Sequence, residues 1–101
     1  MIKSIVAIDA DLQDLVPQFV ENRRKDIETL RQLLKDDDLN AISQLAHKIK
    51  GAAAGYGFNE LSELAAEMEK ASKGNDHDPL AELVKRMETH FLNLEIRYVS
   101  M

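Results

Sequence analysis

Four segments of the chain repeat apolar residues every three or four positions, and short polar breaks separate these segments. Such spacing places the apolar side chains of each segment on one face of an α-helix. Pro17, Asp38, Gly57 and the pair Asp78–Pro79 mark the breaks with residue types that begin or end helices. Connections this short join helices that lie side by side and run in opposite directions. The pattern predicts an all-α fold, an antiparallel up-down four-helix bundle with a short N-terminal helix around residues 9–15.

Further residues set the expected limits of these helices. Gly55 and Gly57 are expected to end the second helix, and Asn59 is expected to cap the third. The apolar spacing of the fourth helix continues as far as Leu94. No segment is recognised as a β-strand, and no internal repeat is found. Residues 1–101 are therefore expected to form a single domain, since a chain of this length has room for only one core.

The charge and composition exclude several classes of protein. A formal net charge of -5 argues against binding to nucleic acid, which needs a basic face. The absence of cysteine excludes disulfides, cysteine-ligated zinc and thiol catalysis. Asp9 and Asp11 interrupt the short apolar run at the N-terminus, and no later run is long enough to span a membrane. We therefore expect a monomeric cytoplasmic protein that binds neither nucleic acid nor membrane.

His47 is the residue of the second helix that most invites a functional interpretation. A helical wheel places it nearly opposite the apolar face, with Lys48 and Lys50 on its flanks. Gly51 follows one turn later, although a glycine inside a helix costs about 1 kcal/mol relative to alanine. Because helical side chains lean toward the N-terminus, a larger residue at this position would project over the ring of His47. The glycine thus leaves the ring open to the approach of something large.

The residue types around His47 indicate phosphoryl chemistry. A neutral imidazole has a free ring nitrogen that can act as a nucleophile, and Lys50 is placed to hold an oxyanion beside it. No local serine or carboxylate suits hydrolysis, and no pattern predicts a pocket that excludes water. The set suits transient attachment of a phosphoryl group, completed by a partner protein. The alternative for an isolated histidine between lysines is an ordinary solvated surface.

The stretch AHKIKGAAAGYGF, residues 46–58, resembles the signature of histidine-containing phosphotransfer (HPt) domains. That signature runs H-x-x-K-G, then small residues, a glycine ten residues after the histidine, an apolar residue and later a leucine. The matching positions are His47, Lys50, Gly51, Gly57, Phe58 and Leu61. The resemblance extends over most of the chain, because the preceding helix and the order of helices also agree with the family.

This resemblance implies a phosphorelay intermediate, a phosphocarrier without kinase activity of its own. His47 would be the residue that is phosphorylated, receiving the phosphoryl group from the aspartate of a response-regulator receiver domain and returning it. Lys50 would steady the phosphoryl oxygens, and Gly51 would keep the ring accessible. The expected partners are the receiver domain and an upstream hybrid histidine kinase. No cofactor is expected on this chain, since magnesium would belong to the receiver.

Glu69 and three residues near His47 complete the candidate site. If the second and third helices turn near Phe58, Glu69 lies level with His47. Some members of the family place a Glu or Gln there that hydrogen-bonds the ring nitrogen that is not phosphorylated, so Glu69 is a candidate for orienting the ring. The alternative for Glu69 is a solvated surface. The candidate partner-binding residues are Gln44, Lys48 and Ala54.

The sequence leaves two other functions open. The first alternative is a helical adaptor that is not phosphorylated and only docks a partner protein. A small metal-binding bundle ranks last, because the core faces are apolar and no metal site is expected. His90 is expected to be a half-buried packing residue, and His77 to serve in capping and in a turn.

Overall fold

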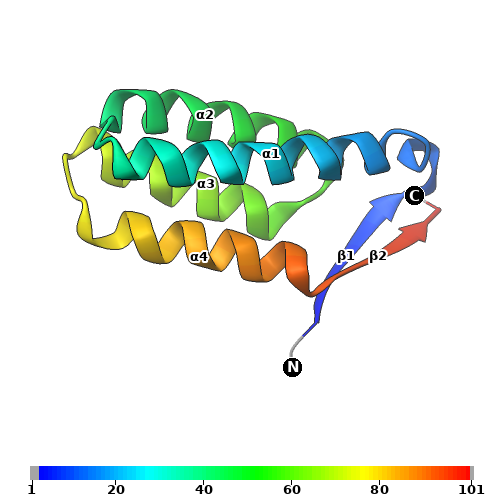
Figure 1. Cartoon of the computed structure of the whole chain (residues 1–101). Helices are drawn as coiled ribbons and strands as arrows, with labels where there is room; N and C mark the ends of the chain where they lie inside the picture. Colours follow the sequence, from blue (N-terminus) through cyan, green and yellow to red (C-terminus); the bar gives the residue numbers. More distant parts are fainter. Residues whose placement is uncertain (1–2, 101) are drawn as a thin grey trace.

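Four α-helices account for most of residues 3–100, the part of the chain that the computed structural model describes. They are α1 (Val16–Lys35), α2 (Leu39–Tyr56), α3 (Asn59–Lys73) and α4 (Asp78–Leu92). Figure 1 shows the chain passing back and forth along the long axis of the molecule, so that each helix leads back past the one before it. None of the described helices is long and apolar enough to cross a membrane.

The ends of α2 follow from the residues at its two boundaries. The side chain of Asp38 accepts a hydrogen bond from the backbone N–H of Ala41 at 3.1 Å, which confirms the expected cap. At the other end Gly57 has a φ of 92°, a left-handed conformation that glycine adopts without steric cost. Gly55, in contrast, lies inside α2 and does not end it.

The starts of α3 and α4 differ in detail from the sequence prediction. Asn59 is the first helical residue of α3, and Phe58 occupies the cap position without a side-chain hydrogen bond, so the predicted Asn59 cap is wrong. His77 precedes α4 but does not cap it either. Its Nδ1 atom instead lies 2.9 Å from Oδ1 of Asp37, in the connection between α1 and α2. His77 therefore joins the two connections at one end of the molecule.

Two short strands pair at the opposite end of the molecule, β1 (Ser4–Asp9) and β2 (Leu94–Val99). They run parallel, in a register that places Ser4 beside Leu94 and Asp9 beside Val99. The four predicted helices are present, but the prediction that the chain has no strand is wrong, as is the continuation of the fourth helix through Leu94. Leu94 fits the helical spacing that precedes it, yet it also begins a strand.

A single 3-10 turn, Ala10–Leu12, stands where a short N-terminal helix was predicted. The side chain of Asp9 accepts a hydrogen bond from the backbone N–H of Asp11 at 3.0 Å, which fixes the start of this turn. The turn carries the chain from β1 toward α1.

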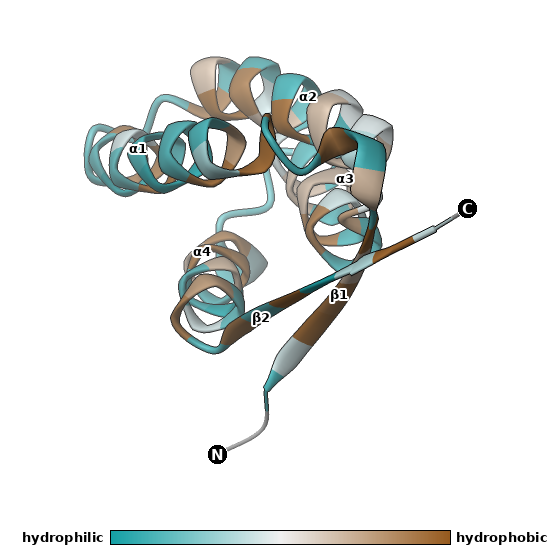
Figure 2. Cartoon of the chain, turned by 90° about the vertical axis from the view of Figure 1, so that its right-hand side faces the viewer, coloured by the Kyte–Doolittle hydropathy of each residue, from teal (hydrophilic) through white to brown (hydrophobic). Residues whose placement is uncertain are grey.

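The core lies between the four helices and the inner face of β1. Phe58 is fully buried where α2 turns into α3, with its ring centroid 4.8 Å from that of Phe19 on α1. Val6 and Ile8 of β1 are buried against the same end, whereas Ile5 is exposed. Figure 2 views this end and shows the strands lying beside α3 and α4. The other fully buried large side chains include Leu30, Ile42, Ile49, Leu61, Met68, Leu80 and Met87.

Candidate functional site

His47 projects from the outer face of α2, as the helical wheel predicted. Its side chain is 69% exposed, while Ala46 and Ile49 beside it on the helix are buried in the core. The second helix thus packs one face against the bundle and presents the imidazole from the other.

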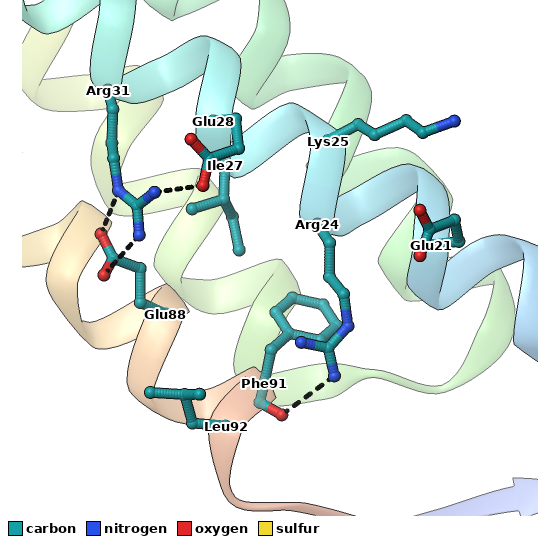
Figure 3. Close-up of a pocket in the computed structure, with 9 residues that line it drawn as sticks. All are labelled: Glu21, Arg24, Lys25, Ile27, Glu28, Arg31, Glu88, Phe91 and Leu92. Atoms are coloured by element: carbon teal, nitrogen blue, oxygen red, sulfur yellow. Dashed lines mark hydrogen bonds and ion pairs between the residues drawn. The ribbon is translucent and has the colours of Figure 1, made fainter.

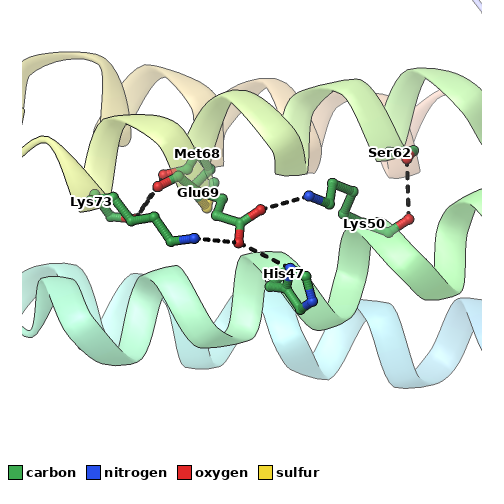
Figure 4. Close-up of polar contacts among 7 residues, drawn as sticks. His47, Lys50, Ser62, Met68, Glu69 and Lys73 are labelled. Carbon is green, nitrogen blue, oxygen red and sulfur yellow. Dashed lines mark hydrogen bonds and ion pairs between the residues drawn. The ribbon is translucent and has the colours of Figure 1, made fainter.

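Glu69 of α3 lies directly beside His47 (Figure 4). Its Oε2 atom is 3.0 Å from Nδ1 of the imidazole. Glu69 is only 8% exposed, so it does not belong to a solvated surface. The pairing of α2 with α3 brings together two residues that are 22 positions apart in the chain.

Two lysines hold the carboxylate of Glu69 from either side. The Nζ atom of Lys50 donates a hydrogen bond to Oε1 at 2.8 Å, and Nζ of Lys73 lies 3.1 Å from Oε2. These contacts lower the pKa of Glu69 to about 2, and the contact with Lys50 has the larger effect. Glu69 is therefore ionised at neutral pH.

The ionised carboxylate determines which nitrogen of His47 carries the proton. A carboxylate without a proton can only accept hydrogen bonds, so the Nδ1 atom that contacts it must be the donor. The lone pair of the neutral ring is then on Nε2. Figure 4 shows this second nitrogen pointing away from Glu69. The site thus presents a free nucleophilic nitrogen on an exposed ring.

Hydroxyl groups of α3 support the two helices that carry the site. Ser62 donates a hydrogen bond to the backbone carbonyl of Lys50 at 3.1 Å, which ties α3 to α2 next to the site. Ser72 is buried and donates to the backbone carbonyls of Met68 and Glu69. The residue Lys73 was not singled out from the sequence. Its position four residues after Glu69, on the same face of one helix, is the signal that could have found it.

The surface around His47 is open and made of small or polar residues. Gln44, Lys48, Gly51 and Ala54 are all exposed on α2. A Cβ atom at Gly51 would meet no atom of the rest of the protein within 4 Å, so internal packing does not require glycine there. Any steric reason for this glycine concerns longer side chains or an approaching molecule.

A shallow hollow of about 340 Å³ adjoins the imidazole. It is lined by Ser43, Gln44, His47, Glu69 and Lys73. Because the hollow is open and the imidazole is exposed, water reaches the ring freely. The arrangement can present a nucleophile, but it does not by itself shield reacting atoms from water.

A second hollow, between α1 and α4, carries no comparable group (Figure 3). Its main polar contact is the pair of Arg31 and Glu88, in which two guanidinium nitrogens each lie 2.7 Å from a carboxylate oxygen. The hydrogen bond from Arg31 lowers the pKa of Glu88. Arg24 donates to the backbone carbonyl of Phe91 at 3.4 Å. Of the residues that line this hollow, Arg24, Arg31 and Glu88 make these contacts, and none is a histidine, serine or threonine.

Within residues 3–100, no three histidine, aspartate or glutamate side chains gather in a way that could hold a metal ion. The family model of the Hpt domain matches residues 14–97 of the chain, which include all four helices from Val16 onward. Neither the curated proteins nor the solved structures yield a match.

Proposed function

Because the chain belongs to the Hpt domain family, we propose that it carries a phosphoryl group on His47 to and from the aspartate of response-regulator receiver domains. Hpt domains serve phosphotransfer in two-component signalling, as phosphocarriers rather than enzymes, and interact with response regulators and kinases. The observation that carries the proposal is the contact of Nδ1 of His47 with Glu69, which places the lone pair of the neutral ring on Nε2 of an exposed side chain. A docking adaptor would have no use for a nucleophile prepared in this way.

The proposed transfer forms one bond and breaks another. The lone pair on Nε2 of His47 bonds to phosphorus, and the bond from phosphorus to the aspartyl oxygen of the receiver breaks. The electron pair of that bond leaves with the aspartate carboxylate. The proton on Nδ1 stays in place, and the adjacent carboxylate of Glu69 balances the positive charge that the ring gains. The return of the phosphoryl group reverses these steps.

Lys50 and Lys73 would supply positive charge beside the incoming phosphoryl group. Both ammonium groups contact Glu69, and both side chains end within the neighbourhood of His47. Flexible lysine stems allow the ammonium groups to reach phosphoryl oxygens without a movement of the helices. Phosphoryl transfer depends mainly on such positioning and charge stabilisation. In this proposal magnesium belongs to the receiver, and the chain itself needs no cofactor.

The exposed residues of α2 would form the docking surface for the receiver. This surface has few protruding side chains beside His47, so the receiver can bring its aspartate close to the ring. Its residues are Gln44, Lys48, Gly51 and Ala54. The donor in this account is an upstream hybrid histidine kinase. That donor and the cytoplasmic location stay predictions.

Phosphotransfer from a radiolabelled phospho-receiver tests the proposal. The wild-type chain should acquire an acid-labile label, and the His47→Gln variant should acquire none. His77→Gln is the matched control, because His77 is also exposed and also contacts a carboxylate. Label that persists in His47→Gln would refute the assignment. Binding of the receiver without any transfer to the wild-type chain would favour the adaptor.

A further inference from the structure

The outer edge of β2 presents backbone groups that have no partner in the sheet. In a parallel pair of strands, alternate residues direct their N–H and C=O groups toward the neighbouring strand. Ser4 donates from its backbone N–H to the carbonyl of Asn93 at 2.9 Å and stands beside Leu94. This register turns the backbone groups of Leu94, Ile96 and Tyr98 away from β1.

The opposite edge of the sheet, on β1, is already covered. A Cβ atom placed on Gly57 would lie 3.6 Å from the backbone oxygen of Ala7, so the turn between α2 and α3 runs along that edge. No such cover exists on β2 among residues 3–100, where the outward backbone groups of Leu94, Ile96 and Tyr98 make no hydrogen bond. Two strands alone form a marginal sheet, and an open edge is a template for a further strand.

We propose that a second copy of this chain pairs with the open edge of β2, antiparallel, about a two-fold axis at Ile96. The outward-facing residues would then form the hydrogen-bonded pairs that an antiparallel ladder requires. Ile96 would face Ile96 of the second copy, and Leu94 would face Tyr98 of the second copy. The product is one continuous four-stranded sheet shared by two molecules, with the same surface used on both sides.

The charged side chains of β2 favour this register and favour a second copy of the same strand as the partner. With the axis at Ile96, Glu95 of each copy faces Arg97 of the other, and opposite charges facing each other across strands are stabilising. An axis at Glu95 or at Arg97 would leave one of the three outward residues without a partner in β2, and it would oppose two glutamates or two arginines. Glu95 and Arg97 already lie on one face of the strand, with a carboxylate oxygen 2.9 Å from a guanidinium nitrogen. The strand is thus complementary to itself in one arrangement.

The shared sheet would also reduce the exposure of apolar side chains at the end of the strand. Tyr98 is 37% exposed in the single molecule. In the dimer its side chain would pack against Leu94 of the second copy on the adjacent strand. His47 lies on α2, and within residues 3–100 its ring makes its polar contact with Glu69 of α3 and none with either strand. The dimer therefore stands apart from the phosphoryl proposal and can fail or succeed independently of it.

Sedimentation of the full chain across a range of concentrations tests the dimer. The wild-type protein should approach twice its chain mass of 11.4 kDa as the concentration rises. Arg97→Glu should raise the dissociation constant about ten-fold, because it opposes glutamates in both cross-strand pairs. Exchanging the charges with Glu95→Arg and Arg97→Glu together should restore the dimer. Arg86→Glu is the matched control, an equal change of charge on an exposed residue of α4 that should leave association unchanged.

A backbone variant keeps the test decisive if a charge variant fails to fold. Tyr98→Pro removes an N–H that faces outward, so pairing with β1 keeps its hydrogen bonds while the new strand loses one. This variant should keep the wild-type circular dichroism and should dissociate at higher concentrations than the wild type. A wild-type chain that stays monomeric at every concentration would overturn the proposal. A dimer that neither Arg97→Glu nor Tyr98→Pro weakens would also overturn it.

Discussion

The Nδ1 atom of His47 lies 3.0 Å from Oε2 of Glu69, a nearly buried carboxylate on the neighbouring helix. Lys50 and Lys73 keep that carboxylate ionised, so the contact fixes the proton on Nδ1. The identity of the free nitrogen on the exposed side of α2 is thereby determined by Glu69 of α3. The functional proposal depends on this relationship, and several of its consequences can be measured.

Removing the carboxylate should change both the tautomer of His47 and the rate of transfer. In Glu69→Ala the Nδ1 atom loses its acceptor, so nitrogen NMR should show a mixture of ring tautomers in place of the Nδ1–H form. Phosphotransfer from a phospho-receiver should slow about ten-fold, the order expected for loss of one charge-assisted hydrogen bond. Glu67→Ala changes an exposed glutamate of the same helix and should alter neither readout. An unchanged tautomer in Glu69→Ala would contradict the proposed orientation of the ring.

Substitutions at Gly51 should separate helix stability from access to the ring. Gly51→Ala should raise the free energy of unfolding by about 0.5–1 kcal/mol, since the new Cβ meets open space and alanine favours the helix. Its transfer rate should stay close to that of the wild type. Gly51→Gln should also fold, but its longer side chain should slow transfer by obstructing the receiver. Urea unfolding and labelling kinetics on the two variants measure both effects. A transfer rate of Gly51→Gln equal to that of Gly51→Ala would refute the steric role.

A bulky charge on the proposed docking surface should weaken binding of the receiver. Ala54 is exposed on α2 on the same outer surface as His47, so Ala54→Arg should reduce affinity about ten-fold without unfolding the helix. Ala81→Arg on α4 is the matched control, because Ala81 is an exposed helical alanine outside that surface. Titration calorimetry with the receiver compares the two variants. If both variants bind equally well, the receiver docks elsewhere.

The buried histidine His90 should make the protein less stable in mild acid. His90 is 2% exposed, and burial lowers its pKa below 6.5, although the nearby carboxylate of Glu60 opposes the shift. The folded state then binds fewer protons at this ring than the unfolded state does, so the free energy of unfolding falls as the pH drops below about 6.5. Urea unfolding at about pH 7.5 and about pH 5.5, roughly one unit above and below the ordinary pKa of histidine, measures the loss of unfolding free energy. The loss should be smaller in His90→Leu, and an equal loss in both proteins would exclude His90 as its source.

The helices could be predicted from sequence because their apolar spacing is sustained over many turns and their boundaries carry local signals such as Asp38. The strands could not, because each has only six residues. Leu94 satisfied both the helical spacing before it and the strand alternation after it. The alternation of Leu94, Ile96 and Tyr98 with Glu95 and Arg97 was the available signal. His90 shows a similar limit, because it was expected to be half-buried and is 2% exposed in the fold, where its ring packs against Phe58 at the turn between α2 and α3.

Part of the candidate site could likewise be predicted from the sequence, and part depends on the packing of α3 against α2. His47, Lys50 and Gly51 lie within two turns of one helix, so their spacing alone brought them together. Glu69 could be placed level with His47, but its burial and its contact depend on how α3 rotates against α2. Lys73 reaches the site through that same packing and was missed. A wheel drawn for one helix contains no information on the rotation of the next.

The position of the phosphoryl group on the ring tests whether Glu69 leaves Nε2 of His47 as the reacting atom. The chain phosphorylated by a phospho-receiver can be analysed by phosphorus and nitrogen NMR at neutral pH, with the modified residue mapped by mass spectrometry. We expect one phosphoryl group, on Nε2 of His47, with the proton still on Nδ1. A phosphoryl group on Nδ1, or on any residue other than His47, would contradict it.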